Sequence, residues 1–159
     1  MIAILIGLVF IVLHIPVGGI NYVPHWAGYI LVLWGLSKNA DSEGRGSAMA
    51  VAAASALLSG GLWIAALFGY GMAFPLDELL QLLMTYQLLV WCEGLEEMAE
   101  SYLISRFRMS WYALAGARVA AIVLGVFMPP LGWVWSAAAF VAGLFYTYTY
   151  YRLQTMVER

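Results

Sequence analysis

The residues of this chain that could do chemistry are few, and three of them lie in one short segment. Both histidines, His14 and His25, and the amide Asn21 fall within residues 14–25, together with two glycines and two prolines. Imidazole and amide groups can hold a proton, a cation or a polar solute, so these three side chains are candidate ligand-binding residues. The alternative is an ordinary tight turn, because two histidines without a fixed spacing are weak evidence for a metal.

Two acidic residues, Asp77 and Glu78, follow a later turn of the chain. If that turn lies on the same side as the segment 14–25, the two carboxylates could complete a cation site with the histidines. They could equally favour the N-terminus of a helix, where the macrodipole stabilises negative charge. The first interpretation adds Asp77 and Glu78 to the candidate ligand-binding residues.

A further group of ionisable residues combines an acidic stripe with a lone arginine. Four glutamates recur at i, i+3, i+4 and i+7, a spacing that places them on one helix face: Glu93, Glu96, Glu97 and Glu100. Arg118 stands inside an apolar run, at a depth from which its long side chain could reach Glu93 on a neighbouring helix. The pair is either a structural tie between two helices, or a polar site that binds a cation, a proton or an anionic headgroup.

No catalytic or metal-binding motif accompanies these residues. The chain has no Gly-x-Ser-x-Gly, no His-Glu-x-x-His and no phosphate-binding glycine loop. Cys92 is the only cysteine, which excludes an internal disulfide and a multi-cysteine metal site. We therefore predict no catalytic residue and no metal site, and the sequence identifies no cofactor.

The composition of the chain is typical of integral membrane proteins, so transmembrane segments must position these residues. Hydrophobic residues make up 64% of the 159 residues and charged residues only 10%, and the mean hydropathy is +0.87. Soluble domains are about 45–50% apolar and about 25% charged, so these few charges could not cover a soluble core. The predicted surroundings are therefore the lipid bilayer. The net charge of −2 excludes the basic surface that nucleic-acid binding requires.

Six apolar runs, each bounded by polar, glycine or proline residues, predict six transmembrane helices. They span residues 1–17, 24–37, 47–70, 76–98, 111–128 and 131–152. Prolines near the starts of the second, fourth and sixth runs suit the first turn of a helix, where the missing N–H costs nothing. We predict an all-α bundle of three helical hairpins, 1–46, 47–108 and 111–159, in a single polytopic domain over residues 1–159. The first run lacks the basic start and cleavage pattern of a signal peptide, so we expect it to remain as a helix.

The basic residues predict how this bundle is oriented. Six of the seven fall in three groups, after the second, fourth and sixth helices: Lys38 and Arg45, Arg106 and Arg108, Arg152 and Arg159. Because lysine and arginine near helix ends mark the cytoplasmic side, both termini are predicted to be cytoplasmic. The protein is then a multi-pass protein of the cytoplasmic (inner) membrane.

Small residues recur every four positions in two of the predicted helices. They form one ridge at Ala48, Ala52, Ala56 and Gly60, and another at Ala113, Ala117, Ala121 and Gly125. Such ridges let helix backbones approach closely in lipid. We expect the third and fifth helices to be central in the bundle; the competing use of the ridges is a homo-oligomer interface.

One stretch resembles a known group of proteins. Residues 19–31, Gly-Ile-Asn-Tyr-Val-Pro-His-Trp-Ala-Gly-Tyr-Ile-Leu, continuing to Gly35-Leu36, resemble small uncharacterised membrane proteins of Gram-positive bacteria. That group carries a similar Gly-x-Ile-Asn-x-Leu-Pro-Asp-x-x-Gly-Tyr-x-Leu pattern near the N-terminus. The resemblance covers about a quarter of the present chain. His25 stands where the pattern usually has aspartate. The resemblance implies no established activity. It implies that the first turn and the second helix form a defined structural or recognition element.

These features favour a binding or transport component for a small solute or an ion. An accessory or assembly subunit of a larger membrane complex is the main alternative, because small-residue ridges and the glutamate stripe also suit contacts with another membrane protein. An intramembrane enzyme is the third, built from His14, His25 and Asp77. The ligand itself stays unknown at this level.

Overall fold

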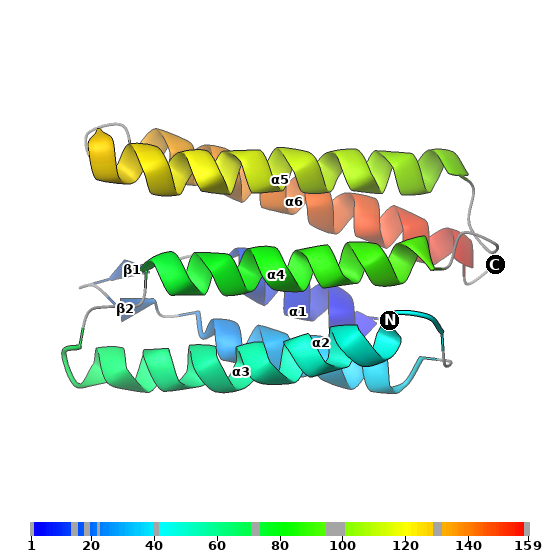
Figure 1. Cartoon of the computed structure of the whole chain (residues 1–159), viewed down its shortest axis with the longest axis horizontal. Helices are drawn as coiled ribbons and strands as arrows, with labels where there is room; N and C mark the ends of the chain where they lie inside the picture. Colours follow the sequence, from blue (N-terminus) through cyan, green and yellow to red (C-terminus); the bar gives the residue numbers. More distant parts are fainter. Residues whose placement is uncertain are drawn as a thin grey trace. The chain divides into compact units, whose positions relative to one another are not determined.

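The computed structural model describes residues 2–13, 16–17, 20–21, 23–39, 42–70, 74–94, 101–128 and 132–157. Within these residues the chain forms six α-helices and one short antiparallel strand pair (Figure 1). The helices are α1 (Ile2–Val12), α2 (His25–Ser37), α3 (Arg45–Leu67), α4 (Phe74–Glu93), α5 (Ser101–Phe127) and α6 (Gly132–Val157). The strands β1 (Pro16–Val17) and β2 (Ile20–Asn21) pair with Pro16 opposite Asn21. The predicted helical fold and its number of helices are confirmed.

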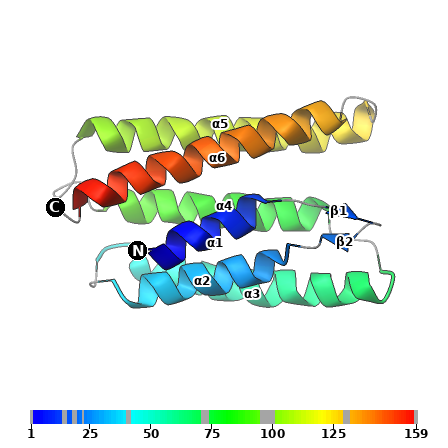
Figure 2. The same cartoon turned by 180° about the vertical axis from the view of Figure 1, so that it is seen from behind.

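The chain divides into two compact units, Met1–Leu95 with α1 to α4 and Glu96–Arg159 with α5 and α6. In the first unit each helix packs against the next along the chain. The helices α3 and α4 lie nearer the viewer in Figure 1, and α1 and α2 lie nearer in Figure 2. In the second unit α5 and α6 lie side by side. The single domain over residues 1–159 stays a prediction.

Four boundaries differ from the predicted runs by five residues or more. One is the end of the sixth helix, at Val157 rather than 152. The first helix ends at Val12 rather than 17, because β1 begins at Pro16 and proline cannot continue a helix. The fourth helix ends at Glu93 rather than 98. The fifth begins at Ser101 rather than 111. Its added turns are amphipathic and bury Leu103, Ile104 and Phe107 on one face, a helical pattern that a search for uniformly apolar runs passes over.

Glycines bring α1 and α2 into backbone contact. A Cβ atom built on Gly28 would lie 2.7 Å from the carbonyl oxygen of Gly7, and one on Gly7 would lie 2.6 Å from the carbonyl oxygen of Gly28. Only glycine permits so close an approach of two helix backbones. The first hairpin is therefore held by its glycines, a contact that the sequence analysis did not single out.

The predicted small-residue ridges are only partly buried. On α3 the buried positions are Ala48, Ala52, Ser55 and Ser59, so the buried face drifts from the predicted Ala56 and Gly60. On α5 Ala121 is buried but Ala113 is exposed. The reason is that a helix turns once every 3.6 residues, so a strict four-residue repeat rotates out of any fixed interface.

In the second unit, aromatic rings and one polar bridge join the two helices. Phe107 of α5 packs against Tyr146 of α6, with 4.7 Å between the ring centroids, and against Tyr150 at 6.0 Å. The hydroxyls of Ser110 and Thr149 lie 2.8 Å apart and are buried. These contacts fix the rotation of α5 against α6.

Two helical segments of the described chain are long and apolar enough to cross a membrane, Arg45–Leu67 and Ser101–Leu124. The helix α1 is apolar but shorter. Large apolar side chains remain exposed on these segments, among them Leu57 at 79% and Phe68, directly after α3, at 78%.

Candidate functional site

A buried contact between His25 and Asp77 is the chemically distinctive feature of the first unit. The imidazole Nδ1 of His25 lies 2.5 Å from the carboxylate Oδ2 of Asp77. The side chain of His25 is only 3% exposed and that of Asp77 17%. The pair is therefore largely shielded from water, and the side chain of Asp77 is still partly exposed.

Three helices and the residue that follows a fourth contribute to this contact. His25 is the first residue of α2, and Asp77 lies in the first turn of α4, where the helix dipole favours its negative charge. The other ring nitrogen of His25, Nε2, lies 3.0 Å from the carbonyl oxygen of Leu13, directly after α1. The hydroxyl of Ser59 on α3 donates to Asp77 Oδ1 at 3.3 Å. We call His25, Asp77, Gln81 and Ser59 the polar cluster.

Gln81 completes the polar cluster one helical turn from Asp77. Its amide Nε2 lies 3.1 Å from His25 Nδ1 and 3.3 Å from Asp77 Oδ2. A carboxylate oxygen only accepts hydrogen bonds, so the amide nitrogen and not its oxygen must face Asp77. The opposite atom, Gln81 Oε1, is buried and has no hydrogen-bond partner among the described residues. Buried acceptors are seldom left unpaired, so this oxygen is available to a donor or a cation.

The pair has two protonation states, and the observed 2.5 Å contact fits the one with a proton between Nδ1 and Oδ2. Because a carbonyl oxygen can only accept, His25 Nε2 must carry a hydrogen and donate it to Leu13. When Nδ1 also carries a proton, it donates to Asp77 and the pair is neutral overall. When Nδ1 is bare, it and Asp77 Oδ2 are both acceptors, so the two atoms must move apart; the amide of Gln81 can then donate to Nδ1, and the pair carries one negative charge. The polar cluster can thus release one proton without losing all its hydrogen bonds.

Packing between α2 and α3 holds the cluster in place. Trp26 follows His25 and meets Trp63 of α3 edge to face, with 6.3 Å between the ring centroids. Ser55, one turn along α3 from Ser59, is also buried, and its hydroxyl has no hydrogen-bond partner among the described residues. The polar surface inside this unit therefore extends one helical turn beyond the cluster.

The structure brings together two of the predicted ligand-binding residues, His25 and Asp77. His14 lies outside the described residues, and only the backbone of Asn21 is described, in β2. Glu78 is half-buried beside Asp77 and makes contacts of its own. No group of three histidine, cysteine or acidic side chains that could hold a metal ion occurs in the described part of the chain.

The predicted pair of Glu93 and Arg118 involves both units. Glu93 is the half-buried last residue of α4, and Arg118 lies in α5 and is only 4% exposed. Both side chains have interaction partners. Their pairing stays a prediction, and Glu96, Glu97 and Glu100 of the acidic stripe lie outside the described residues.

Sequence reasoning missed Gln81 and Ser59. Gln81 is four residues after Asp77 and therefore on the same helix face. Ser55 and Ser59 share the same spacing within an otherwise apolar helix. Polar residues repeated at helical spacing inside an apolar segment were the signal that could have found both.

Comparison with known proteins adds no relative. The chain matches no protein-family model, no curated protein and no solved structure.

Proposed function

We propose that this chain is an integral membrane protein whose six helices cross the cytoplasmic membrane with both termini inside. The apolar composition and the two segments Arg45–Leu67 and Ser101–Leu124 support this placement. So do the large apolar side chains exposed on them, because soluble proteins rarely expose contiguous apolar patches.

This orientation sets the polar cluster toward the outer face. The helix α2 runs from His25 to Ser37, directly before Lys38, and α3 begins at Arg45. Lys38 and Arg45 therefore lie at the end of the first unit opposite His25, about 20 Å away at 1.5 Å per residue. If the basic end is cytoplasmic, the His25–Asp77 pair lies near the outer face.

Within that placement, the protein binds and transports a small solute or ion, and the binding step is linked to a proton held between His25 and Asp77. The observation that carries this proposal is the buried 2.5 Å contact of Nδ1 with Oδ2. Ionisable groups at membrane depth are costly, and they mark ion pathways and proton relays. The unpaired Gln81 Oε1 beside the contact supplies an acceptor for the solute or ion.

The chemistry follows from the two protonation states. In the protonated state His25 and Asp77 satisfy each other and the cluster is neutral. Loss of the proton leaves one negative charge near Gln81 Oε1, which a cation or a hydrogen-bond donor can then approach. Binding of the ligand and binding of the proton are therefore expected to compete.

Proton flux into liposomes tests this proposal. The purified protein is reconstituted with a pH-sensitive dye inside, and a potassium gradient with valinomycin drives proton entry. We expect flux well above that of protein-free liposomes, reduced at least tenfold by Asp77→Asn, which keeps the shape of the side chain and removes its charge.

The matched control is Glu43→Gln, which neutralises an exposed acid in the turn between α2 and α3. It should leave the flux unchanged. Equal flux in the Asp77→Asn protein and the unmodified protein, or flux no greater than in protein-free liposomes, would contradict proton linkage at this pair.

A further inference from the structure

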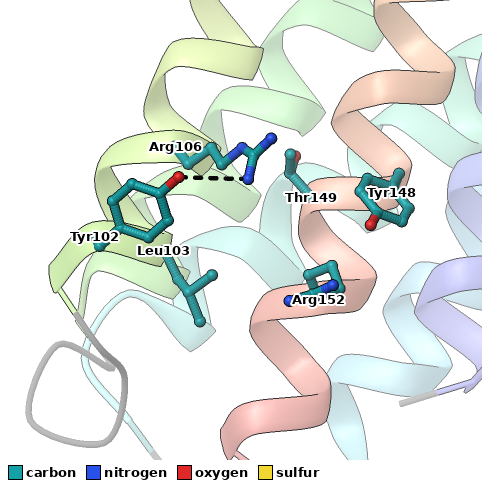
Figure 3. Close-up of a pocket in the computed structure, with 6 residues that line it drawn as sticks. All are labelled: Tyr102, Leu103, Arg106, Tyr148, Thr149 and Arg152. Atoms are coloured by element: carbon teal, nitrogen blue, oxygen red, sulfur yellow. Dashed lines mark hydrogen bonds between the residues drawn. The ribbon is translucent and has the colours of Figure 1, made fainter.

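The second unit contains a pocket of its own between α5 and α6. Its lining comes from the first turns of α5 and the last turns of α6 (Figure 3): Tyr102, Leu103, Arg106, Tyr148, Thr149 and Arg152. The space is about 350 Å³, including the part open to solvent. The enclosed part is only about 50 Å³, much smaller than a typical ligand pocket, so it has room for a small group such as a phosphate and not for a whole lipid.

Two arginines line this pocket. Arg106 and Arg152 come from different helices, and among the residues that the structure describes the lining includes no carboxylate. Arg106 Nη1 donates a long hydrogen bond of 3.4 Å to the hydroxyl oxygen of Tyr102. Neither arginine has an acidic partner among the described residues of the chain. Two guanidinium groups beside one space repel each other, and an anion between them removes that cost.

The arrangement of the side chains favours an anion with several oxygen atoms. Figure 3 shows the guanidinium of Arg106 extending from α5 toward Thr149 on α6, and Arg152 on the same side of α6. A guanidinium donates two parallel hydrogen bonds to phosphate oxygens. Tyr102 and Tyr148 add hydroxyl groups at the rim of the pocket. A phosphate group matches this set of donors.

We propose that this pocket binds the phosphate group of an anionic lipid headgroup. The inference rests on the membrane placement proposed above and not on the His25–Asp77 pair. In that placement Arg106 and Arg152 lie at the cytoplasmic interface, where basic pockets between helices bind anionic headgroups. Tyrosine is enriched at the same depth, which accounts for the two aromatic residues at the rim.

The test uses the full chain in a neutral detergent, with native mass spectrometry to count bound molecules. Dioctanoyl phosphatidylglycerol is the anionic probe, dioctanoyl phosphatidylcholine its zwitterionic counterpart and inorganic phosphate the soluble source. We expect the chain to retain phosphatidylglycerol preferentially. Arg106→Gln with Arg152→Gln should weaken that binding at least tenfold, because each arginine contributes charge-assisted hydrogen bonds.

The control is Arg108→Gln, which removes the same charge from the same helix. Two residues rotate the side chain by about 200° around α5, so this change should leave the affinity intact. Equal loss in the control, or no loss in the double variant, overturns the pocket. Inorganic phosphate that binds as tightly as phosphatidylglycerol overturns the lipid assignment.

Membrane placement is measured separately, by whether the chain stays in the membrane fraction after extraction with alkaline carbonate. A chain that is released overturns the membrane proposal. A chain that is retained, but whose double variant still binds phosphatidylglycerol normally, overturns the pocket alone.

Discussion

Substitution of Gly28 by alanine should separate α1 from α2 and disturb the polar cluster. The added Cβ atom would lie 2.7 Å from the carbonyl oxygen of Gly7. That is about 0.7 Å closer than the 3.4 Å at which ordinary van der Waals contact begins. The obstacle is backbone, which cannot rotate away, so the helices themselves must move apart.

The expected loss of stability follows from this shift. Overpacking a close helix contact costs about 1–3 kcal/mol, which lowers the melting temperature of a chain of this size by about 2–12 °C. The same shift would lengthen the hydrogen bond from His25 Nε2 to the carbonyl oxygen of Leu13, which is now 3.0 Å long. Stretched by the same amount to about 3.7 Å, it would no longer be a hydrogen bond. We therefore expect Gly28→Ala to reduce proton flux as well.

Thermal unfolding in detergent measures the first effect, and the liposome assay measures the second. Gly61→Ala on α3 is the matched control, because a Cβ atom there meets nothing within 4 Å. It should raise stability slightly, since alanine is a better helix former than glycine by about 1 kcal/mol. Equal melting temperatures for the two variants would refute the backbone contact between α1 and α2.

Two further measurements test the remaining expectations. If Arg118 pairs with Glu93, Arg118→Leu with Glu93→Leu should be less destabilising than the sum of the single changes by at least about 1 kcal/mol; additive losses in a double-mutant cycle would argue against the pair. For the topology, a cysteine at Tyr70, which is 73% exposed after α3, should react with an impermeant maleimide in intact cells, and one at Glu43 only after permeabilisation. Cys92 is buried and should stay silent; the reverse pattern would invert the predicted orientation.

The His25–Asp77 pair has a structural interpretation as well as the functional one. A buried pair can simply hold α2 against α4, and removal of one partner then costs about 3–5 kcal/mol. What distinguishes the polar cluster from a simple tie is Gln81, which faces both partners with its amide nitrogen and leaves its oxygen unpaired. A pair that only held α2 against α4 would need neither the amide of Gln81 nor its unpaired oxygen. This is why the liposome assay measures flux and not stability.

The two units differ in what their interiors contain. The polar cluster lies inside the first unit, among four helices. The second unit buries Phe107 and Tyr146 and bridges its helices through Ser110 and Thr149. It also buries Arg118, while Arg106 and Arg152 line the pocket between its two helices. The first unit is therefore where we expect the solute to pass, and the second is where we expect contact with the headgroups.

The sequence by itself determined the helical class, the number of helices and the positions of most turns. These depend on local features: apolar runs, prolines at helix starts and the hydrogen bonding of residues four apart. The same local reasoning placed the start of the fifth helix ten residues late, because Leu103, Ile104 and Phe107 are buried on one side of a segment that also carries charges.

Only the tertiary structure decided which polar groups meet. His25 and Asp77 are 52 residues apart, and composition indicated only that they could share one side of a bundle. Their contact depends on the rotation of α2 and α4, which the glycines of α1 and α2 and the tryptophans of α2 and α3 help to set. Arg106 and Arg152 were topology markers in the sequence and became one pocket when α5 packed on α6. Helix formation is local, but helix rotation and register depend on side chains distant in the chain, so the sites emerge only in the packed molecule.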